Sequence, residues 1–153
     1  GMEVTQFTYF QQCGGIDCHP IPIEITYGLE RIAMFLQNKE NIWDLNWDKN
    51  TTYRDIWLDF EKDQCSFNFK ESNPDNLRNL FNIYTEEAES LVLKNLTYPA
   101  LDFVLKCSHC FNLLDARGVI SVTDRAQYIE KIRNLAKVVA NSWAQKHQKT
   151  VNK

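Results

Sequence analysis

The sequence has no long hydrophobic run, no large excess of charge of one sign, and few glycines and prolines. Its 153 residues include five glycines and four prolines, and 17 lysines and arginines against 20 aspartates and glutamates leave a net charge of −3. No apolar run approaches the roughly 18–20 residues of a transmembrane helix. The charge balance excludes a surface that is basic throughout, and residues 1–6 lack the basic and apolar regions of a signal peptide. We therefore expect a soluble, cytoplasmic chain that buries its own core.

An odd number of cysteines argues against a disulfide framework, and the chain has five. Two groups, Cys13-x4-Cys18 and Cys107-x2-Cys110, have spacings that zinc ligands can use. The second pair falls in an apolar stretch of helical period that lacks the turn residues of a zinc knuckle. We expect Cys107 and Cys110 to be core residues and expect no metal held by them.

The first part of the chain is typical of two strands followed by a helix. Residues 2–12 alternate and are rich in Thr, Phe, Tyr and Val, and both faces of this predicted strand mix polar and aromatic side chains. Residues 13–15 break the strand. Residues 21–27 predict a second strand, which Gly28 ends, and apolar spacing predicts a helix over 29–37.

The rest of the chain divides into a connector and a helical part. Residues 38–73 read as an irregular connector whose many aromatic side chains pack on a neighbour. Helix starts are predicted at Asn73-Pro74-Asp75, near Pro99, and at the capping-box pattern Ser121-x-x-Asp124. The basic end at 146–149 suits the C-terminus of the last helix dipole.

These patterns together predict an α+β chain with two domains. Residues 1–72 would form the sheet-bearing domain with its connector, and residues 73–153 would form a bundle of three antiparallel helices. Asp115 and Arg117 are expected to form a structural pair at a helix end.

The segment from Glu24 to Met34 is the most informative for function. A strand leads into Gly28, where a ligand can approach the backbone, and the free N–H groups of the helix start favour an anion. Arg31 in the first helical turn can hold a phosphate or stack on a base. A Glu-Arg pair at a helix start is by itself more often a solvated pair, but the polar side chains of the neighbouring strand favour a site. Glu30 is expected to brace Arg31 or a neighbouring chain.

Residues 24–37 resemble motif 3 of the class II aminoacyl-tRNA synthetases, which supplies an ATP-binding arginine. With residues 1–12, 111–117 and 120–123, they make the whole chain resemble the C-terminal half of the alpha subunit of the two-subunit, bacterial-type glycyl-tRNA synthetase. The resemblance implies part of a class II antiparallel sheet. It also implies Mg²⁺- and ATP-dependent activation of glycine, followed by transfer of the glycyl group to tRNA(Gly). The implied assembly is α2β2, in which the beta subunit binds most of the tRNA.

The resemblance implies a role for each matching residue. Arg31 is the catalytic, ATP-holding arginine, Gly28 allows close approach of the nucleotide, and Glu3 lies near ATP or its magnesium. On the amino-acid side, Glu24 accepts the ammonium group and Gln6 contacts glycine, with Thr8 as a neighbour.

Thr26 stands where the related alanine enzyme has glycine, so its bulk would exclude a substrate methyl. Read from the residues alone, Glu24 could instead be a surface acid, and Gln6 and Thr8 could be polar cross-strand pairs.

Motif 1 and motif 2, with its phosphate-gripping arginine, are not found in these 153 residues. We expect the chain to be an incomplete part of the enzyme that is inactive alone. Two alternatives remain, a non-catalytic module that docks a partner subunit and a paralogue that binds an adenylate.

Overall fold

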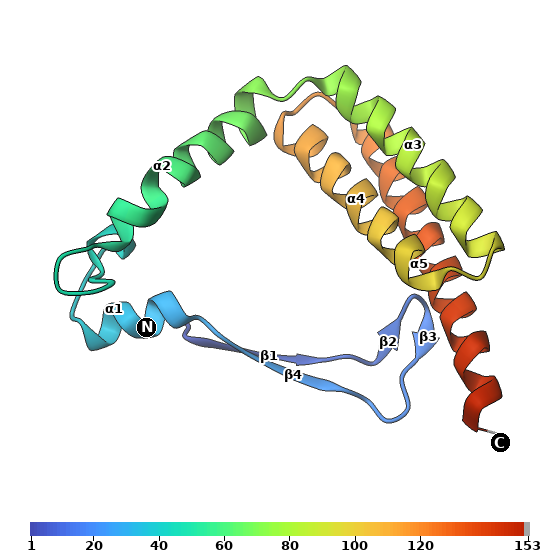
Figure 1. The fold of residues 1–153 in the computed structure, drawn as a ribbon, viewed down its shortest axis with the longest axis horizontal. Coiled ribbons are helices and arrows are strands. Elements are labelled where there is room, and N and C mark those ends of the chain that lie inside the picture. The colour runs from blue at the N-terminus through green and yellow to red at the C-terminus, as the bar shows by residue number, and fades with distance from the viewer. Residues whose placement is uncertain (152–153) are drawn as a thin grey trace. The chain divides into compact units, whose positions relative to one another are not determined.

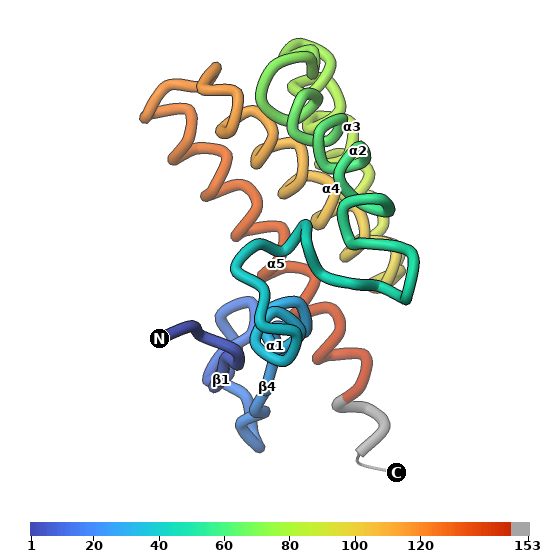
Figure 2. The backbone as a smooth tube through the Cα atoms, turned by 90° about the vertical axis from the view of Figure 1, so that its left-hand side faces the viewer, coloured from blue at the N-terminus to red at the C-terminus, as the bar shows by residue number. Residues whose placement is uncertain are grey.

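A computed structural model describes the backbone of residues 1–151 and the side chains of residues 1–147. It confirms the predicted α+β class, with small antiparallel sheets and five α-helices in the described part (Figures 1 and 2). The side chains of Gln148 and Lys149, part of the predicted basic helix end, lie outside the described residues. None of the described helices is long and apolar enough to cross a membrane.

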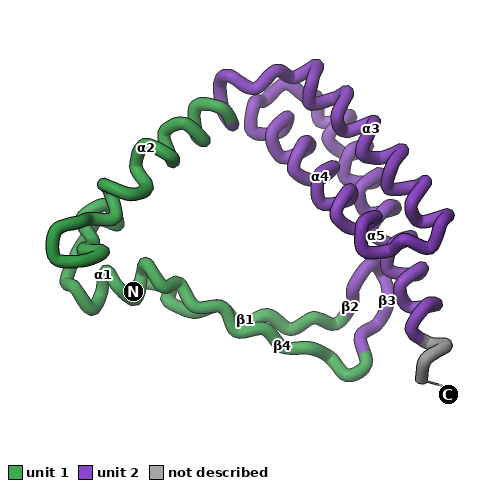
Figure 3. The backbone as a smooth tube through the Cα atoms, in the orientation of Figure 1, with its two compact units in different colours: residues 1–11, 19–67 green, residues 12–18, 68–153 purple. Residues whose placement is uncertain are grey.

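The chain forms two compact units (Figure 3). Unit 1 comprises residues 1–11 and 19–67, and unit 2 comprises residues 12–18 and 68–153. A short hairpin between the first and second long strands therefore belongs with the helices, a grouping that no local sequence pattern indicated.

The main sheet of unit 1 consists of β1 (Thr5–Tyr9) and β4 (Ile23–Tyr27), which pair antiparallel. Two further backbone bonds extend the ladder, from Gly28 N to Val4 O at 2.9 Å and from Phe10 N to Pro22 O at 3.1 Å. Both predicted strands are present. The first is shorter than predicted, because regular pairing with β4 ends at Tyr9.

The register places the polar side chains of β1 on the same face as those of β4. One face carries Gln6, Thr8, Glu24 and Thr26, because opposite residues in an antiparallel pair share a face. The other face is mainly apolar, and its large side chains are each more than half exposed: Phe7, Tyr9, Ile23, Ile25 and Tyr27. The mixing of polar and aromatic side chains that residues 2–12 predict for both faces is present, among the paired residues, on the face that carries Thr5 and the rings.

Unit 1 continues through α1 (Leu29–Leu36) and the 3₁₀-helix η1 (Ile42–Asp44) to α2 (Tyr53–Ser66). The prediction of a helix over 29–37 is confirmed. The prediction of an irregular connector over 38–73 is wrong, because α2 and the π-helical turn η2 (Phe67–Glu71) fill much of it.

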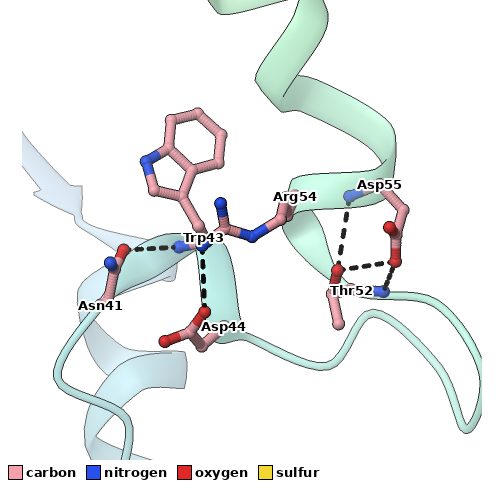
Figure 4. A network of polar contacts seen from close by, with 6 residues as sticks. All are labelled: Asn41, Trp43, Asp44, Thr52, Arg54 and Asp55. Atoms are coloured by element: carbon pink, nitrogen blue, oxygen red, sulfur yellow. Dashed lines mark hydrogen bonds and ion pairs between the residues drawn. The ribbon is translucent and has the colours of Figure 1, made fainter.

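The start of α2 is set by a capping box (Figure 4). Thr52 Oγ1 accepts a bond from Asp55 N at 3.3 Å, and Asp55 Oδ2 accepts one from Thr52 N at 2.8 Å. Arg54 bonds back to Asp44 of η1 at 3.3 Å. The two capping-box bonds satisfy N–H groups that a helix start leaves unpaired.

The aromatic side chains of this region pack on one another. Tyr53 lies between Trp43, Trp47 and Trp57, with ring centroids 6.1, 6.4 and 6.3 Å away, and Trp57 meets Phe60 edge-on at 5.9 Å. The rings thus order η1 against α2. Contact of these rings with another subunit stays a prediction.

The helical part of unit 2 consists of α3 (Pro74–Leu93), α4 (Thr97–Ala116) and α5 (Val122–Val151), which lie side by side in Figures 1 and 2. The predicted cap is confirmed, since Asn73 Oδ1 accepts bonds from Asp75 N at 2.9 Å and Asn76 N at 3.2 Å. Helix α4 begins two residues before Pro99.

The start of α5 follows the capping-box pattern. Ser121 Oγ accepts a bond from Asp124 N at 3.0 Å, and Asp124 Oδ2 accepts one from Ser121 N at 3.3 Å. The Ser121-x-x-Asp124 prediction is therefore confirmed.

These helices share one hydrophobic core, in which Cys107 is fully buried and Cys110 is 3% exposed. The prediction that both are core residues is confirmed. Their partners come from all three helices, and the fully or nearly fully buried ones are Leu77, Phe81, Ala88, Leu91, Ala100, Val104, Phe111, Leu113, Leu114, Leu135 and Val139.

Asp115 and Arg117 do not form the predicted pair. Asp115 accepts bonds from Arg125 Nε at 3.2 Å, and Arg117 donates to the carbonyl oxygens of Phe69 and Lys70. Residues two apart on a helix point in different directions, so each side chain reaches another element instead.

Candidate functional site

The strand register brings the predicted amino-acid-binding residues together. Gln6 lies directly opposite Thr26, and Thr8 lies directly opposite Glu24. Side chains at such positions have Cβ atoms about 4.5–5.5 Å apart, so four polar groups form one patch. In this chain the patch faces solvent, with only Thr8 half-buried.

Thr26 and Glu24 also contact each other along β4. Thr26 Oγ1 donates a hydrogen bond to Glu24 Oε1 at 3.0 Å. A carboxylate can accept several hydrogen bonds, so Glu24 keeps acceptor capacity for a ligand while one oxygen is held. The contact orients the acid and leaves the methyl group of Thr26 as the apolar part of the patch.

Arg31 lies at the strand–helix junction and reaches back to the start of the chain. Its Nη1 donates a hydrogen bond to the backbone carbonyl of Glu3 at 2.8 Å. Its stem passes Gly28, where an added Cβ would lie 3.5 Å from Arg31 Cδ. The structure thus gathers the three predicted ATP-site residues.

Gly28 has φ −81° and ψ 86°, so its backbone does not demand glycine. Its N–H bonds to Val4 O at 2.9 Å and its carbonyl accepts from Ile32 N at 3.0 Å. No described side chain caps α1, so the first-turn N–H groups have no side-chain partner there, as binding of an anion would require. An added Cβ would meet Arg31 only at ordinary van der Waals distance, so close approach of a nucleotide to Gly28 stays a prediction.

A family model described as the glycyl-tRNA synthetase alpha subunit matches residues 1–148. The chain belongs to the glycyl-tRNA synthetase alpha subunit family. The match includes every residue of the patch, the Arg31 junction, α3, α4 and all but the last residues of α5, so the resemblance seen in the sequence is confirmed over nearly the whole chain.

Glu30, also within the family match, has a partner that the sequence did not indicate. Its Oε1 accepts a hydrogen bond from the Tyr53 hydroxyl at 3.2 Å. Burial, followed by the charge of Glu30, raises the pKa of Tyr53. Glu30 therefore links α1 to the start of α2. The sequence signal that could have led to this contact is the capping-box pattern beginning at Thr52, because it places Tyr53 in the first turn of a helix.

Glu3 takes part in the site through its backbone, while its side chain is exposed. Among the described residues, no three or more His, Cys, Asp or Glu side chains gather as a metal site would require. Mg²⁺ bound with ATP needs only one or two protein carboxylates, because phosphate oxygens and water fill its other positions. A single carboxylate at Glu3 fits that requirement, and its role stays a prediction.

A groove of about 700 Å³ lies between α3 and α5 in unit 2 and contains none of the predicted site residues. Its two cationic side chains each pair with a carboxylate. Lys131 bonds to Glu89 at 2.8 Å, and Arg78 bonds to Asp75 at 3.0 Å. Glu86 and Asp124 also line the groove, so it carries charges of both signs, and we assign it no ligand.

Proposed function

We propose that the chain supplies the glycine-binding patch and one ATP-binding arginine of a glycine–tRNA ligase. The enzyme would activate glycine with ATP to glycyl-adenylate and transfer the glycyl group to tRNA(Gly). The observation that carries the proposal is the register that sets Gln6 opposite Thr26 and Thr8 opposite Glu24, next to Arg31. Membership of the alpha subunit family supports it.

On the amino-acid side, Glu24 would accept the ammonium group of glycine. A charged acceptor is the favourable partner for an ammonium group that is removed from water. The Thr26 hydroxyl, 3.0 Å from Glu24, holds the acid in position. Gln6 would offer its amide to the substrate from the opposite strand, and the Thr26 methyl would occupy the space that the side chain of alanine needs.

On the nucleotide side, Arg31 would hold ATP. Arginine has five N–H donors, and the bond to the Glu3 carbonyl at 2.8 Å uses one and directs the guanidinium group. Mg²⁺ would neutralise phosphate charge when bound with ATP, with Glu3 as the nearest candidate ligand from this chain.

The reaction joins a glycine carboxylate oxygen to the α-phosphorus of ATP and releases pyrophosphate. It depends on positioning the reactants and neutralising phosphate charge. Unit 1 has two arginines in its sequence, Arg31 and Arg54, and Arg54 pairs with Asp44. Unit 1 by itself therefore offers one arginine to the phosphates, and we expect residues 1–153 to be inactive alone.

The assembly partner would be a beta subunit, in an α2β2 enzyme located in the cytoplasm, with tRNA(Gly) bound mostly through the beta subunit. The family description, which names an alpha subunit, supports this part of the proposal.

The test is glycine-dependent ATP–pyrophosphate exchange by the enzyme assembled with its beta subunit. Glu24→Gln should raise the KM for glycine about 10- to 100-fold, the range for a lost hydrogen bond to a charged group, while the KM for ATP changes little. Glu30→Gln is the matched control, because Glu30 bonds to Tyr53. An unchanged KM for glycine in Glu24→Gln, or no exchange by the unmodified enzyme, would refute the proposal.

A non-catalytic docking module is the second candidate. The apolar face of β1 and β4, with Phe7 63% and Tyr27 61% exposed, favours contact with another polypeptide. Docking of this kind would survive Arg31→Ala, whereas adenylation would not. Partner binding without any glycine-dependent exchange would favour the module.

A further inference from the structure

The turn of the β2–β3 hairpin packs against α5 more closely than a residue with a side chain would allow. The hairpin consists of β2 (Gln12–Cys13) and β3 (Ile16–Asp17) and belongs to unit 2 together with α5. A Cβ atom built on Gly14 would lie 2.5 Å from Ala140 Cβ and 3.2 Å from Ala136 O. Real Cβ contacts are not this short, so the docking requires glycine at 14 and a small residue at 140.

The hairpin itself is well defined. Gly14 and Gly15 have φ +58° and +78°, as a two-residue turn of the type I′ family requires. Across the strands, Gln12 Nε2 donates a hydrogen bond to Asp17 Oδ1 at 2.7 Å. Such a turn fixes the pairing of the strands on either side.

The same hairpin lies, in the chain, between the two strands that carry the glycine-binding patch. β1, with Gln6 and Thr8, ends at Tyr9, and β4, with Glu24 and Thr26, begins at Ile23. β1 and β4 form a two-stranded sheet, and an isolated pair of strands is only marginally stable in water. Whatever holds the intervening hairpin therefore helps to hold the register of the patch.

We propose that Gly14 is a positioning residue, whose contact with Ala140 anchors the hairpin on α5 and so keeps β1 and β4 in the register that forms the glycine site. The inference rests on the proposed function for its effect on glycine. It assigns α5 a part in amino-acid binding in addition to its part in the helical core.

The experiment compares Gly14→Ala with Gly15→Ala in the enzyme assembled with its beta subunit. Both glycines have positive φ, so alanine strains the backbone at either position. A Cβ at Gly15 meets nothing within 4 Å, whereas one at Gly14 meets α5. The difference between the two variants therefore reports the contact with α5.

The first measurement is hydrogen exchange of the β1 and β4 amides. We expect Gly14→Ala to speed this exchange at least fivefold relative to Gly15→Ala, and we expect Ala140→Gly in the same chain to restore part of the protection. The restoration is partial because Ala136 O stays 3.2 Å from the added atom. Equal exchange in the two glycine variants would overturn the inference.

The second measurement is the KM for glycine against the KM for ATP. Gly14→Ala should raise the KM for glycine at least fivefold with a smaller effect on ATP, and an equal rise in both would contradict a positioning role. If the unmodified enzyme shows no glycine-dependent exchange, the proposed function fails, while the hydrogen-exchange comparison still decides whether Gly14 holds the strands. If Gly14→Ala does not fold, Ala140→Val tests the same contact, because it adds bulk from the side of α5. It should speed exchange of the β1 and β4 amides as Gly14→Ala would. Normal protection of these amides in Ala140→Val would overturn the inference.

Discussion

The guanidinium group of Arg31 is held by the backbone carbonyl of Glu3, with 2.8 Å between Nη1 and the oxygen. The bond joins the first turn of α1 to the residues that lead into β1. Because it uses the backbone of residue 3, it does not depend on the glutamate side chain. The roles of the Arg31 guanidinium group and the Glu3 carboxylate can therefore be tested separately by mutation.

Arg31→Ala should lower kcat/KM for ATP in pyrophosphate exchange by about 10²- to 10³-fold, the usual effect of losing one donor to a developing charge. Arg31→Lys should restore only part of the activity, because lysine keeps the charge but lacks the planar fork. Steady-state kinetics with ATP as the varied substrate measures both variants.

Glu3→Gln is the companion variant, since it keeps the carbonyl that holds Arg31. A weaker Mg²⁺ dependence with unchanged orientation of Arg31 would support a metal role for the carboxylate.

A normal KM for ATP in Arg31→Ala would contradict the ATP role of the arginine.

Replacing Thr26 should change the choice between glycine and alanine. Thr26→Ala opens space on the patch, so discrimination against L-alanine in pyrophosphate exchange should fall roughly tenfold, as expected for about one methyl group. Thr26→Val keeps the bulk but loses the hydrogen bond to Glu24. We expect it to keep excluding alanine while binding glycine more weakly. Equal exclusion of alanine by all three proteins would refute the steric role.

The start of α2 should be sensitive to acid. The hydrogen bonds from Thr52 hold the pKa of Asp55 below its usual range. A depressed folded-state pKa contributes stability above the unfolded pKa, and this stability is lost as pH falls through the folded value. The fluorescence of the tryptophans packed around Tyr53 should therefore change below about pH 4. Asp55→Asn should reduce this change in fluorescence between neutral and acid pH, because it removes the titrating carboxyl group.

Thr52→Ala tests the other half of the capping box. It should lower the free energy of unfolding of unit 1 by about 1 kcal/mol, a typical cost for a lost helix cap. Asp59→Asn is a matched control, because Asp59 is exposed on the same helix and pairs with Lys62 rather than with the cap. An equal effect of both substitutions would argue against a special role for the cap.

The five cysteines should differ widely in reactivity. Burial raises the pKa of Cys107 and of Cys110, and thiolates rather than thiols react. Iodoacetamide at pH 8, followed by peptide mapping, should label exposed Cys13 on the order of 100-fold faster than the buried pair, which reacts only through opening of the helical core. Labelling of Cys107 in native protein at the rate of Cys13 would show that this core is loose.

Several elements could be predicted because their signals are local. Asn73 before Pro74, and Ser121 three residues before Asp124, act within one helical turn, so neighbouring residues alone specify them. The family was predictable for a related reason, since motif 3 is a continuous segment.

Helix α2 was missed although a local signal existed. Thr52-x-x-Asp55 has the form of a capping box, and Tyr53, Ile56, Trp57 and Phe60 follow at helical spacing. The acidic and amide residues among them suggested a loop. They are tolerated because much of the helix is exposed.

The sequence by itself determined the starts of α3 and α5, the two strands and the family, because each depends on residues that are close in the chain. Tertiary structure decided which side chains meet. Gln6 and Thr26 are 20 positions apart, and only the register makes them neighbours. Likewise, no residue near Gly14 in the sequence indicates that Gly14 contacts Ala140 in the folded chain. Contacts of this kind depend on how separate elements pack, and packing is a property of the folded chain as a whole.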